Sequence, residues 1–240
     1  MKVEILYKEL YIYGEKANAT YLELMFEDHD VINTSYLERP FFVDERPDII
    51  FIDAISERYL TKIVEKLMPY KDRLKELIED GVHLIIMNNA MDIFGKSLEI
   101  KEIDRTYQGR TLGLLDYSTI RDYEKRASRL TIAKYKDIEI IGQHMGFSQY
   151  YYSDESQSIY DIRTGYGFNR EIKKGGFRYK NVFATELVGE LFMLNPKVSR
   201  LLLKDLGLPE DLPYEAQVDE LYSFTLDKMK KDAIIMAEYK

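Results

Sequence analysis

The segment HLIIMNNAMDIFG (His83–Gly95) decides the fold class of this 240-residue chain. It opens on HLIIM, an apolar run without polar alternation, which predicts a strand buried on both faces of a parallel sheet. Asn88–Asn89 then form a turn signal, and Met91–Phe94 predict a short helix that Gly95 closes. A buried strand, a tight turn and a helix in direct succession indicate an α/β layer.

The same alternation continues on the N-terminal side of this segment. Val3–Tyr7 and Val31–Ile32 predict strands, and Asp48–Ile52 (DIIFI) predicts another strand buried on both faces. Tyr59–Glu79 carries apolar residues at helical spacing, and Pro69 predicts a break or kink near its middle. Strand and helix therefore alternate three times before Gly95, which favours parallel strands joined by right-handed crossovers.

The C-terminal side predicts shorter and more polar elements. Ser97–Ile103, Arg129–Ala133 and Asp137–Ile141 predict strands, and Tyr150–Ser158 predicts a polar, aromatic loop. Asn181–Thr185 predicts a return to a buried strand.

The last part of the chain predicts helices. Pro196–Asp205 is amphipathic and is followed by Gly207, and apolar residues from Val218 to Met229 mark one face of a final helix. We expect one domain over residues 1–207, with residues 208–240 as a helical appendix packed on it.

Composition excludes several function classes. The net charge of −8 and the pI of about 5.1 argue against non-specific binding of nucleic acids and against attraction to anionic membranes. The N-terminal segment MKVEILYKEL is too charged for a signal peptide, and no uncharged apolar stretch is long enough to span a membrane. We therefore expect a soluble cytoplasmic protein.

The chain contains no cysteine and only three histidines. Disulfides, thiolate zinc sites, iron–sulfur clusters and thiol nucleophiles are therefore excluded, and imidazole-rich metal sites are not expected. We expect neither a metal nor a cofactor.

Four stretches, in order along the chain, resemble class I glutamine amidotransferase domains. The resemblance is to the CobB/CobQ-like (cobyric-acid-synthase-like) type, and within it to the GatD-like glutaminase subunits of lipid II isoglutaminyl synthase. The stretches are LYKELYIYGEKAN (Leu6–Asn18), LIEDGVHLIIMNNAMDIFGKSLE (Leu77–Glu99), LGLLDYST (Leu112–Thr119) and GYGFNREIKKGGFRYKNVFATELVGELFMLNP (Gly165–Pro196). The resemblance implies a flavodoxin-like three-layer sandwich with a mostly parallel sheet and a site at the carboxyl edge of its strands.

The resemblance also implies where the family's chemistry lies in this sequence. A class I glutaminase uses a cysteine thiolate on a strand-to-helix turn, a histidine base, a carboxylate and an oxyanion hole. The cysteine position is occupied by Asn88, the histidine position by Val188 and a carboxylate position by Glu190. The oxyanion loop reads Asp53-Ala54-Ile55-Ser56 and has lost its glycines. Because an amide is no substitute for a thiolate, the resemblance implies a vestigial pocket without glutaminase activity.

Other uses of these polar residues remain open. Asp53, Asn88, Asp92 and Glu190 lie where oxygen ligands would suit Mg²⁺ or Ca²⁺, and paired carboxylates also suit general acid–base chemistry. The alternative is that they cap turns and helix N-termini, as Asn and Asp ordinarily do.

Residues near Tyr150 are candidates for contact with a partner or ligand. Gln149 stands where the family has an arginine that approaches the glutamine or the ligase subunit, and Tyr150 and Tyr151 follow it. His144 lies just before them, in a segment that contacts substrate or partner in the family. Tyrosine is enriched at protein interfaces, although ordinary semi-buried tyrosines and a loop histidine would give the same pattern.

Three hypotheses follow. The first is a catalytically inactive, scaffolding or regulatory subunit that binds a Mur-ligase-type synthetase, because the resemblance implies such a partner. The second is an enzyme with a repurposed pocket that acts on an amide, an amino acid or a cell-wall fragment. The third is a stand-alone module that binds a small ligand.

Overall fold

The computed structural model describes residues 1–12, 14 and 16–238. A six-stranded sheet lies at its centre, with the strand order β13-β14-β4-β3-β1-β2. All of its strands are parallel except the edge strand β13, which is antiparallel to β14. The strands are β1 (Lys2–Leu6), β2 (Asp30–Thr34), β3 (Ile49–Ile52), β4 (His83–Met87), β13 (Phe177–Tyr179) and β14 (Val182–Thr185).

The predicted strands of this sheet are confirmed where the sequence is apolar without alternation. Every residue of Ile49–Ile52 is buried, and Leu84–Met87 are buried as well. The order of the five parallel strands, beginning at β2, is the 2-1-3-4-5 order of flavodoxin-like sheets.

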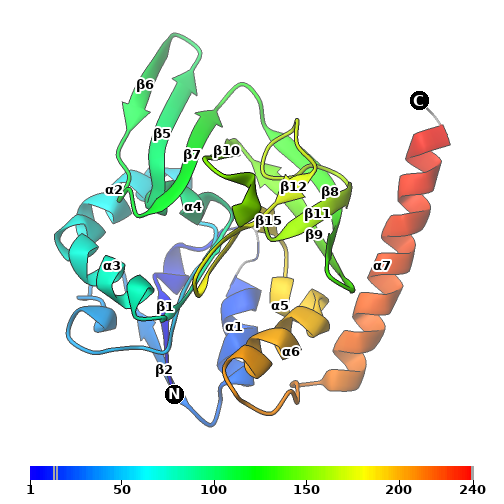
Figure 1. The fold of residues 1–240 in the computed structure, drawn as a ribbon, viewed down its shortest axis with the longest axis horizontal. Coiled ribbons are helices and arrows are strands. Elements are labelled where there is room, and N and C mark those ends of the chain that lie inside the picture. Colours follow the sequence, from blue (N-terminus) through cyan, green and yellow to red (C-terminus); the bar gives the residue numbers. More distant parts are fainter. Residues whose placement is uncertain (13, 15, 239–240) are drawn as a thin grey trace.

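Helices cover both faces of the central sheet (Figure 1). On one side lie α2 (Glu57–Leu67), the short 3-10 helix η3 (Met68–Tyr70) and α3 (Lys71–Glu79). On the other side lie α1 (Lys16–Met25), α5 (Leu191–Leu194) and α6 (Pro196–Asp205). Pro69 lies in η3 and separates α2 from α3, so the predicted break is confirmed. Short 3-10 helices also occur at Lys8–Leu10 (η1) and Phe41–Val43 (η2).

A second layer of two smaller sheets is formed by the segment between β4 and β13, together with β15, which follows β14. One sheet has the order β10-β7-β5-β6 and the other the order β12-β11-β8-β9-β15. The strands are β5 (Gly95–Glu102), β6 (Arg105–Gly109), β7 (Leu115–Asp122), β8 (Ala127–Tyr135), β9 (Ile138–Gly146), β10 (Ser148–Tyr152), β11 (Tyr160–Thr164), β12 (Lys174–Gly175) and β15 (Leu187–Val188).

This layer corrects two expectations from the sequence. A mostly parallel arrangement describes the central sheet only. Among the described strands of the second layer, β5 and β7 pair in parallel and all other pairs are antiparallel. Tyr150–Tyr152 belong to the strand β10, which pairs with β7, whereas a loop was expected. The loop proper is shorter and contains the 3-10 helix η5 (Glu155–Gln157).

Aromatic side chains fill the core between the central sheet and the second layer. The ring of Tyr117 from β7 makes edge contacts with Phe168 at 5.7 Å and with Phe177 at 4.9 Å between centroids. Tyr152 stacks on Phe168 at 4.1 Å. Buried rings of this size contribute large apolar areas, so they fix the second layer above the carboxyl ends of the parallel strands.

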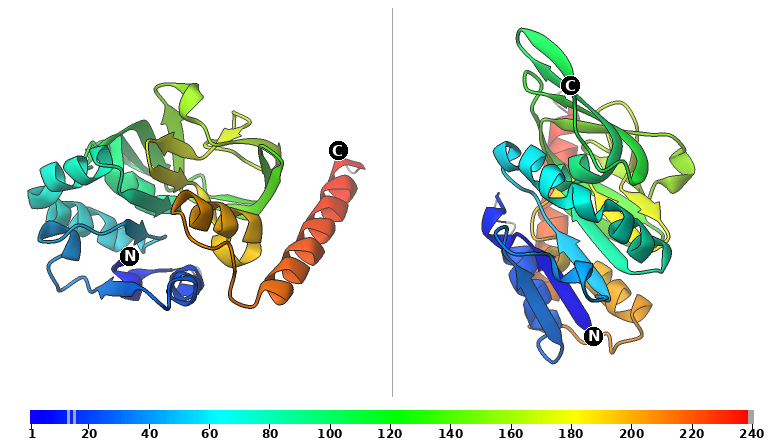
Figure 2. Two further views of the ribbon diagram at one scale, coloured as in Figure 1. Left: turned by 60° about the horizontal axis from the view of Figure 1, so that its bottom comes forward. Right: turned by 90° about the vertical axis from the view of Figure 1, so that its left-hand side faces the viewer.

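The C-terminal helix α7 (Glu215–Glu238) lies along one side of the molecule, beside the β8–β9 hairpin (Figure 2). The Tyr222 hydroxyl donates to the Glu139 carbonyl at 2.8 Å, and Lys230 pairs with the Glu139 carboxylate at 2.7 Å. Tyr222 and Met229 pack with Ile132 and Ile141 in a small separate core. That residues 208–240 form an appendix to a domain ending at residue 207 stays a prediction, and its last two residues lie outside the described chain. No helix within the described residues is long and apolar enough to cross a membrane.

Candidate functional site

The carboxyl end of β4 forms a strained strand-to-helix turn. Asn88 follows Met87 with φ of 44°, in the left-handed region that few residues other than glycine adopt. The 3-10 helix η4 (Asn88–Ala90) and α4 (Met91–Phe94) follow directly, so the predicted short helix is confirmed. A buried strand, a residue at positive φ and a helix together make the geometry of a nucleophile elbow.

The side chain of Asn88 binds the backbone on two sides of this turn. Its Nδ2 donates to the Glu186 carbonyl at 2.7 Å and to the Met145 carbonyl at 3.0 Å. The residue is 4% exposed. Both amide hydrogens therefore fix the turn, one to β9 and the other to the segment that joins β14 to β15. An amide also has no ionisable proton near neutral pH.

The position that the resemblance assigns to the base is apolar and closed. Val188 lies in β15, opposite Gln143 of β9, and is 3% exposed. Glu190 is half-buried and precedes α5. Met91, on the other side of the turn, is fully buried. Of these three side chains, those of Val188 and Met91 are packed into the protein, and that of Glu190 is partly exposed.

The backbone N–H groups of the loop after β3 already have acceptors. The N–H of Ala54 donates to Oδ1 of Asp53 at 2.6 Å, and the N–H of Ile55 donates to Oδ1 of Asn89 at 2.8 Å. Asn18 donates from Nδ2 to Oδ2 of Asp53 at 2.8 Å. An oxyanion hole needs backbone donors that are free to meet developing charge, and these two N–H groups are occupied by side chains.

Two buried charged groups lie around the turn. Asp92 of α4 forms an ion pair with Arg121 of β7 at 2.6 Å and accepts a hydrogen bond from the Ser148 hydroxyl at 2.7 Å. Both members of the pair are buried, and burial of such a pair requires close mutual contact. Asp92 thus belongs to a structural ion pair, and within the described residues no group of three His, Asp or Glu side chains is placed to hold a metal ion.

Glu186 is a buried acid that the sequence reasoning missed. Its Oε2 accepts hydrogen bonds from the Gly176 N–H at 2.9 Å and the Tyr160 hydroxyl at 3.0 Å, whereas Oε1 has no partner among the described residues. Burial raises the pKa of Glu186 to about 7. The sequence gives one signal for this buried acid. Glu186 directly follows the predicted buried strand Asn181–Thr185 and comes two positions before Val188.

The candidate contact residues divide into two groups. His144 and Tyr150 are each 1% exposed, and the Tyr150 hydroxyl donates to the Asn88 carbonyl at 2.9 Å. Nδ1 of His144 lies 2.8 Å from the Gly167 carbonyl, and burial lowers the pKa of His144 to about 4. Gln149 and Tyr151 are half-buried and reach the surface. Of the four, only these last two are placed to touch a partner in this conformation.

One relative is similar to this chain in sequence, and solved structures are similar to it in fold. No family model matches the chain. The subunit GatD of lipid II isoglutaminyl synthase (glutamine-hydrolyzing) from Staphylococcus aureus (strain N315) is 30% identical over 174 residues, which are 70% of this chain and 67% of that protein. A solved glutamine amidotransferase aligns with a TM-score of 0.51 and 13% identity, over 85% of this chain and 99% of the other. A glutamine amidotransferase from Thermotoga maritima aligns with a TM-score of 0.48 and 9% identity, over 88% and 86%.

Proposed function

The chain belongs to the family of GatD-like glutamine amidotransferase subunits, and from this premise we propose that it is a catalytically inactive member that acts by binding a protein partner. Its vestigial pocket comprises Asn88, Val188, Glu190, Asp53 and Ala54. The sequence contains no cysteine, so the thiolate on which the family's glutamine hydrolysis depends is absent.

One structural observation supports inactivity in addition to the missing thiol. The groups that would stabilise an oxyanion or admit a substrate are bonded to one another, through Asn89 to Ile55 and through Asp53 to Ala54. Asp53 also places a carboxylate where negative charge would develop, and this would repel it. An enzyme with a repurposed pocket would need these side chains open to a substrate, whereas Asp53 is 0% exposed.

The partner is inferred from the family. The Staphylococcus relative is named as a subunit of a synthase, and a Mur-ligase-type synthetase is the partner that the resemblance to this family implies. In such a complex the chain would scaffold or regulate the synthetase without supplying ammonia. Gln149 and Tyr151 alternate with buried residues and lie on the half-exposed face of β10, where a partner can reach them.

Two measurements test the two parts of this proposal. For inactivity, the purified chain is incubated with glutamine and ammonia release is followed, with the Staphylococcus relative as positive control. We expect release at the buffer background, and a rate above it would contradict inactivity. For the partner, the chain is mixed at micromolar concentration with a Mur-ligase-type synthetase from the same cell and analysed by size-exclusion chromatography. Failure to co-elute would contradict the partner.

A further inference from the structure

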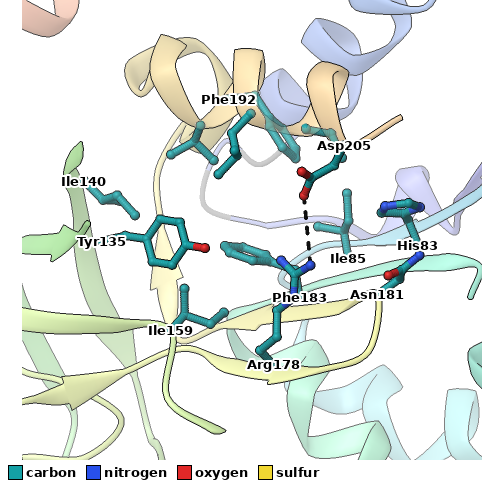
Figure 3. A pocket seen from close by; sticks show the side chains of 13 residues that line it. His83, Ile85, Tyr135, Ile140, Ile159, Arg178, Asn181, Phe183, Phe192 and Asp205 are labelled. Atoms are coloured by element: carbon teal, nitrogen blue, oxygen red, sulfur yellow. Dashed lines mark ion pairs between the residues drawn. The ribbon is translucent and has the colours of Figure 1, made fainter. Parts of the chain in front are cut away.

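An apolar cavity lies at the opposite end of β4 from Asn88 (Figure 3). It occupies about 60 Å³ between the central sheet and α6. His83, the first residue of β4, is at its edge, while Asn88 follows the last residue of the same strand. A strand of this length separates its ends by roughly 16 Å, so the cavity is distinct from the vestigial pocket.

The positions of the apolar residues along β4, β14 and α6 explain why their side chains meet at this cavity. Ile85 of β4 and Phe183 of β14 are paired residues on neighbouring parallel strands, so their side chains stand on the same face of the sheet. Val198, Leu201 and Leu202 of α6 follow an i, i+3, i+4 spacing and form one face of that helix. The cavity is the space that these two apolar faces leave between them.

The mouth of the cavity carries one positive and one negative side chain. Arg178 of β13 is the cross-strand neighbour of Phe183, and Asp205 lies seven residues after Val198 on the same face of α6. Their side chains face each other across the mouth in Figure 3, with 4.0 Å between Nη2 and Oδ2. This is longer than the roughly 2.7–2.9 Å of a charge-assisted hydrogen bond. The two charges are therefore close but not hydrogen-bonded to each other.

Both charged groups retain capacity for a ligand. Arg178 is anchored by Nε, which donates to the Lys180 carbonyl at 3.0 Å, and this leaves its terminal nitrogens toward Asp205. Within the described chain, no group donates a hydrogen bond to the Asp205 carboxylate. Burial lowers the pKa of the neighbouring His83, which disfavours a positive charge on its imidazole.

We propose that this cavity binds a free aliphatic α-amino acid. The ligand's carboxylate would lie on Arg178, its ammonium group on Asp205 and its side chain among Ile85, Phe183 and Leu202. The ammonium group would also meet the C-terminal end of α6, where the helix dipole favours positive charge. A simple carboxylic acid would face the like charge of Asp205, and a simple amine that of Arg178, so only a zwitterion is complementary to both.

The volume of the cavity limits the size of the ligand's side chain. A cavity of about 150 Å³ accommodates the six carbons of benzene, so the volume of about 60 Å³ here holds roughly two or three carbons. A branched side chain such as that of valine suits this space, and the longer side chain of leucine would extend into the mouth. Glycine would leave the apolar space unfilled. The class of ligand is therefore set by the pair of charges at the mouth and the size of the space behind them.

L-leucine is the probe for the first test, with three analogues as matched controls. We measure binding to the full chain by isothermal titration calorimetry and the shift in Tm by scanning calorimetry. We expect leucine to bind and, at about a hundredfold excess over its Kd, to raise Tm by roughly 5 °C or more. 4-Methylpentanoate, 3-methylbutylamine and glycine each lack one element of recognition and are expected to bind at least about tenfold more weakly. Equal binding of either singly charged analogue, or no binding of leucine or valine at 10 mM, would overturn the proposal.

Single substitutions then locate the site. Asp205→Asn and Arg178→Gln are expected to weaken leucine binding at least about tenfold, because each removes a charge that faces the ligand. Asp161→Asn is the control, since it breaks a comparably exposed ion pair with Lys174, and neither of these two residues lines the cavity. Val198→Phe fills the space and is expected to abolish binding in a chain that remains folded by circular dichroism. Unchanged affinity in Asp205→Asn, or an equal loss in Asp161→Asn, would show that the cavity is not the site.

Discussion

Replacing Glu186 by glutamine is expected to flatten part of the pH dependence of stability. The acid is fully buried, and burial raises its pKa to about 7 from an ordinary value of 4.5. A group whose pKa is higher in the folded state binds its proton more tightly there, so its contribution is fully present below pH 4.5 and is lost as pH rises toward 7. The difference between the two pKa values corresponds to about 3 kcal/mol.

The contacts of Glu186 explain why glutamine is the right substitution. A glutamine keeps an oxygen to accept from the Gly176 N–H and the Tyr160 hydroxyl, and it remains neutral at every pH. His144 also titrates in this range, because burial lowers its pKa to about 4, and its contribution rises with pH between about 4 and 6.5. The comparison of wild type with variant cancels His144 and isolates Glu186.

Urea unfolding at half-unit steps from pH 4 to pH 8 provides the measurement. The free energy of unfolding of wild type minus that of Glu186→Gln should fall by about 3 kcal/mol across the range and then level off above pH 7. Glu139→Gln, at an exposed ion pair, is a control that should show no comparable change. If the difference in the free energy of unfolding between wild type and variant does not vary between pH 4.5 and pH 7, the raised pKa of Glu186 is refuted.

Three further predictions concern the elbow, the buried ion pair and α7. Asn88→Ala removes both donors to buried carbonyls and should lower the free energy of unfolding by about 2–4 kcal/mol in urea, so a loss below 1 kcal/mol would contradict these bonds. Arg121→Met leaves Asp92 buried without its partner and should cost about 3–5 kcal/mol, whereas the double change Arg121→Met with Asp92→Leu should cost clearly less. Tyr222→Phe removes one partly buried hydrogen bond between α7 and β9 and should cost no more than about 1.5 kcal/mol by thermal unfolding. A larger loss would mean that α7 supports the whole domain.

The central sheet was predictable because its residues are apolar on both faces. The runs DIIFI and HLIIM have no polar alternation, and such runs are buried wherever they lie in an α/β layer. Pro69 separated two helices for an equally local reason, since proline lacks the N–H that a continuous helix needs. These elements follow from residues within one short window of sequence.

Several strands of the second layer were predicted, but their pairing and the burial of polar residues between them were not predictable in this way. Tyr150 belongs to a strand because Thr119, more than thirty positions earlier, supplies its pairing partner. Glu186 is buried because Tyr160 of β11 and Gly176, between β12 and β13, bind its carboxyl group. Its acidic character suggested exposure, since unpaired Glu is rarely buried. Long-range partners of this kind leave no trace in local spacing.

The contacts around the elbow show what holds Asn88 in its conformation. Asn88 keeps the positive φ of a nucleophile elbow, a conformation that costs free energy and persists only when the surroundings hold it. Here the surroundings that hold it are the Met145 and Glu186 carbonyls, which receive both hydrogens of the amide. Reintroducing a cysteine at this position would remove these two bonds and would still leave the Ala54 and Ile55 N–H groups occupied. Under the proposal of inactivity, the loss of chemistry lies in a network that joins the turn, β9 and the loop after β3, and restoring the cysteine alone would not free these backbone donors.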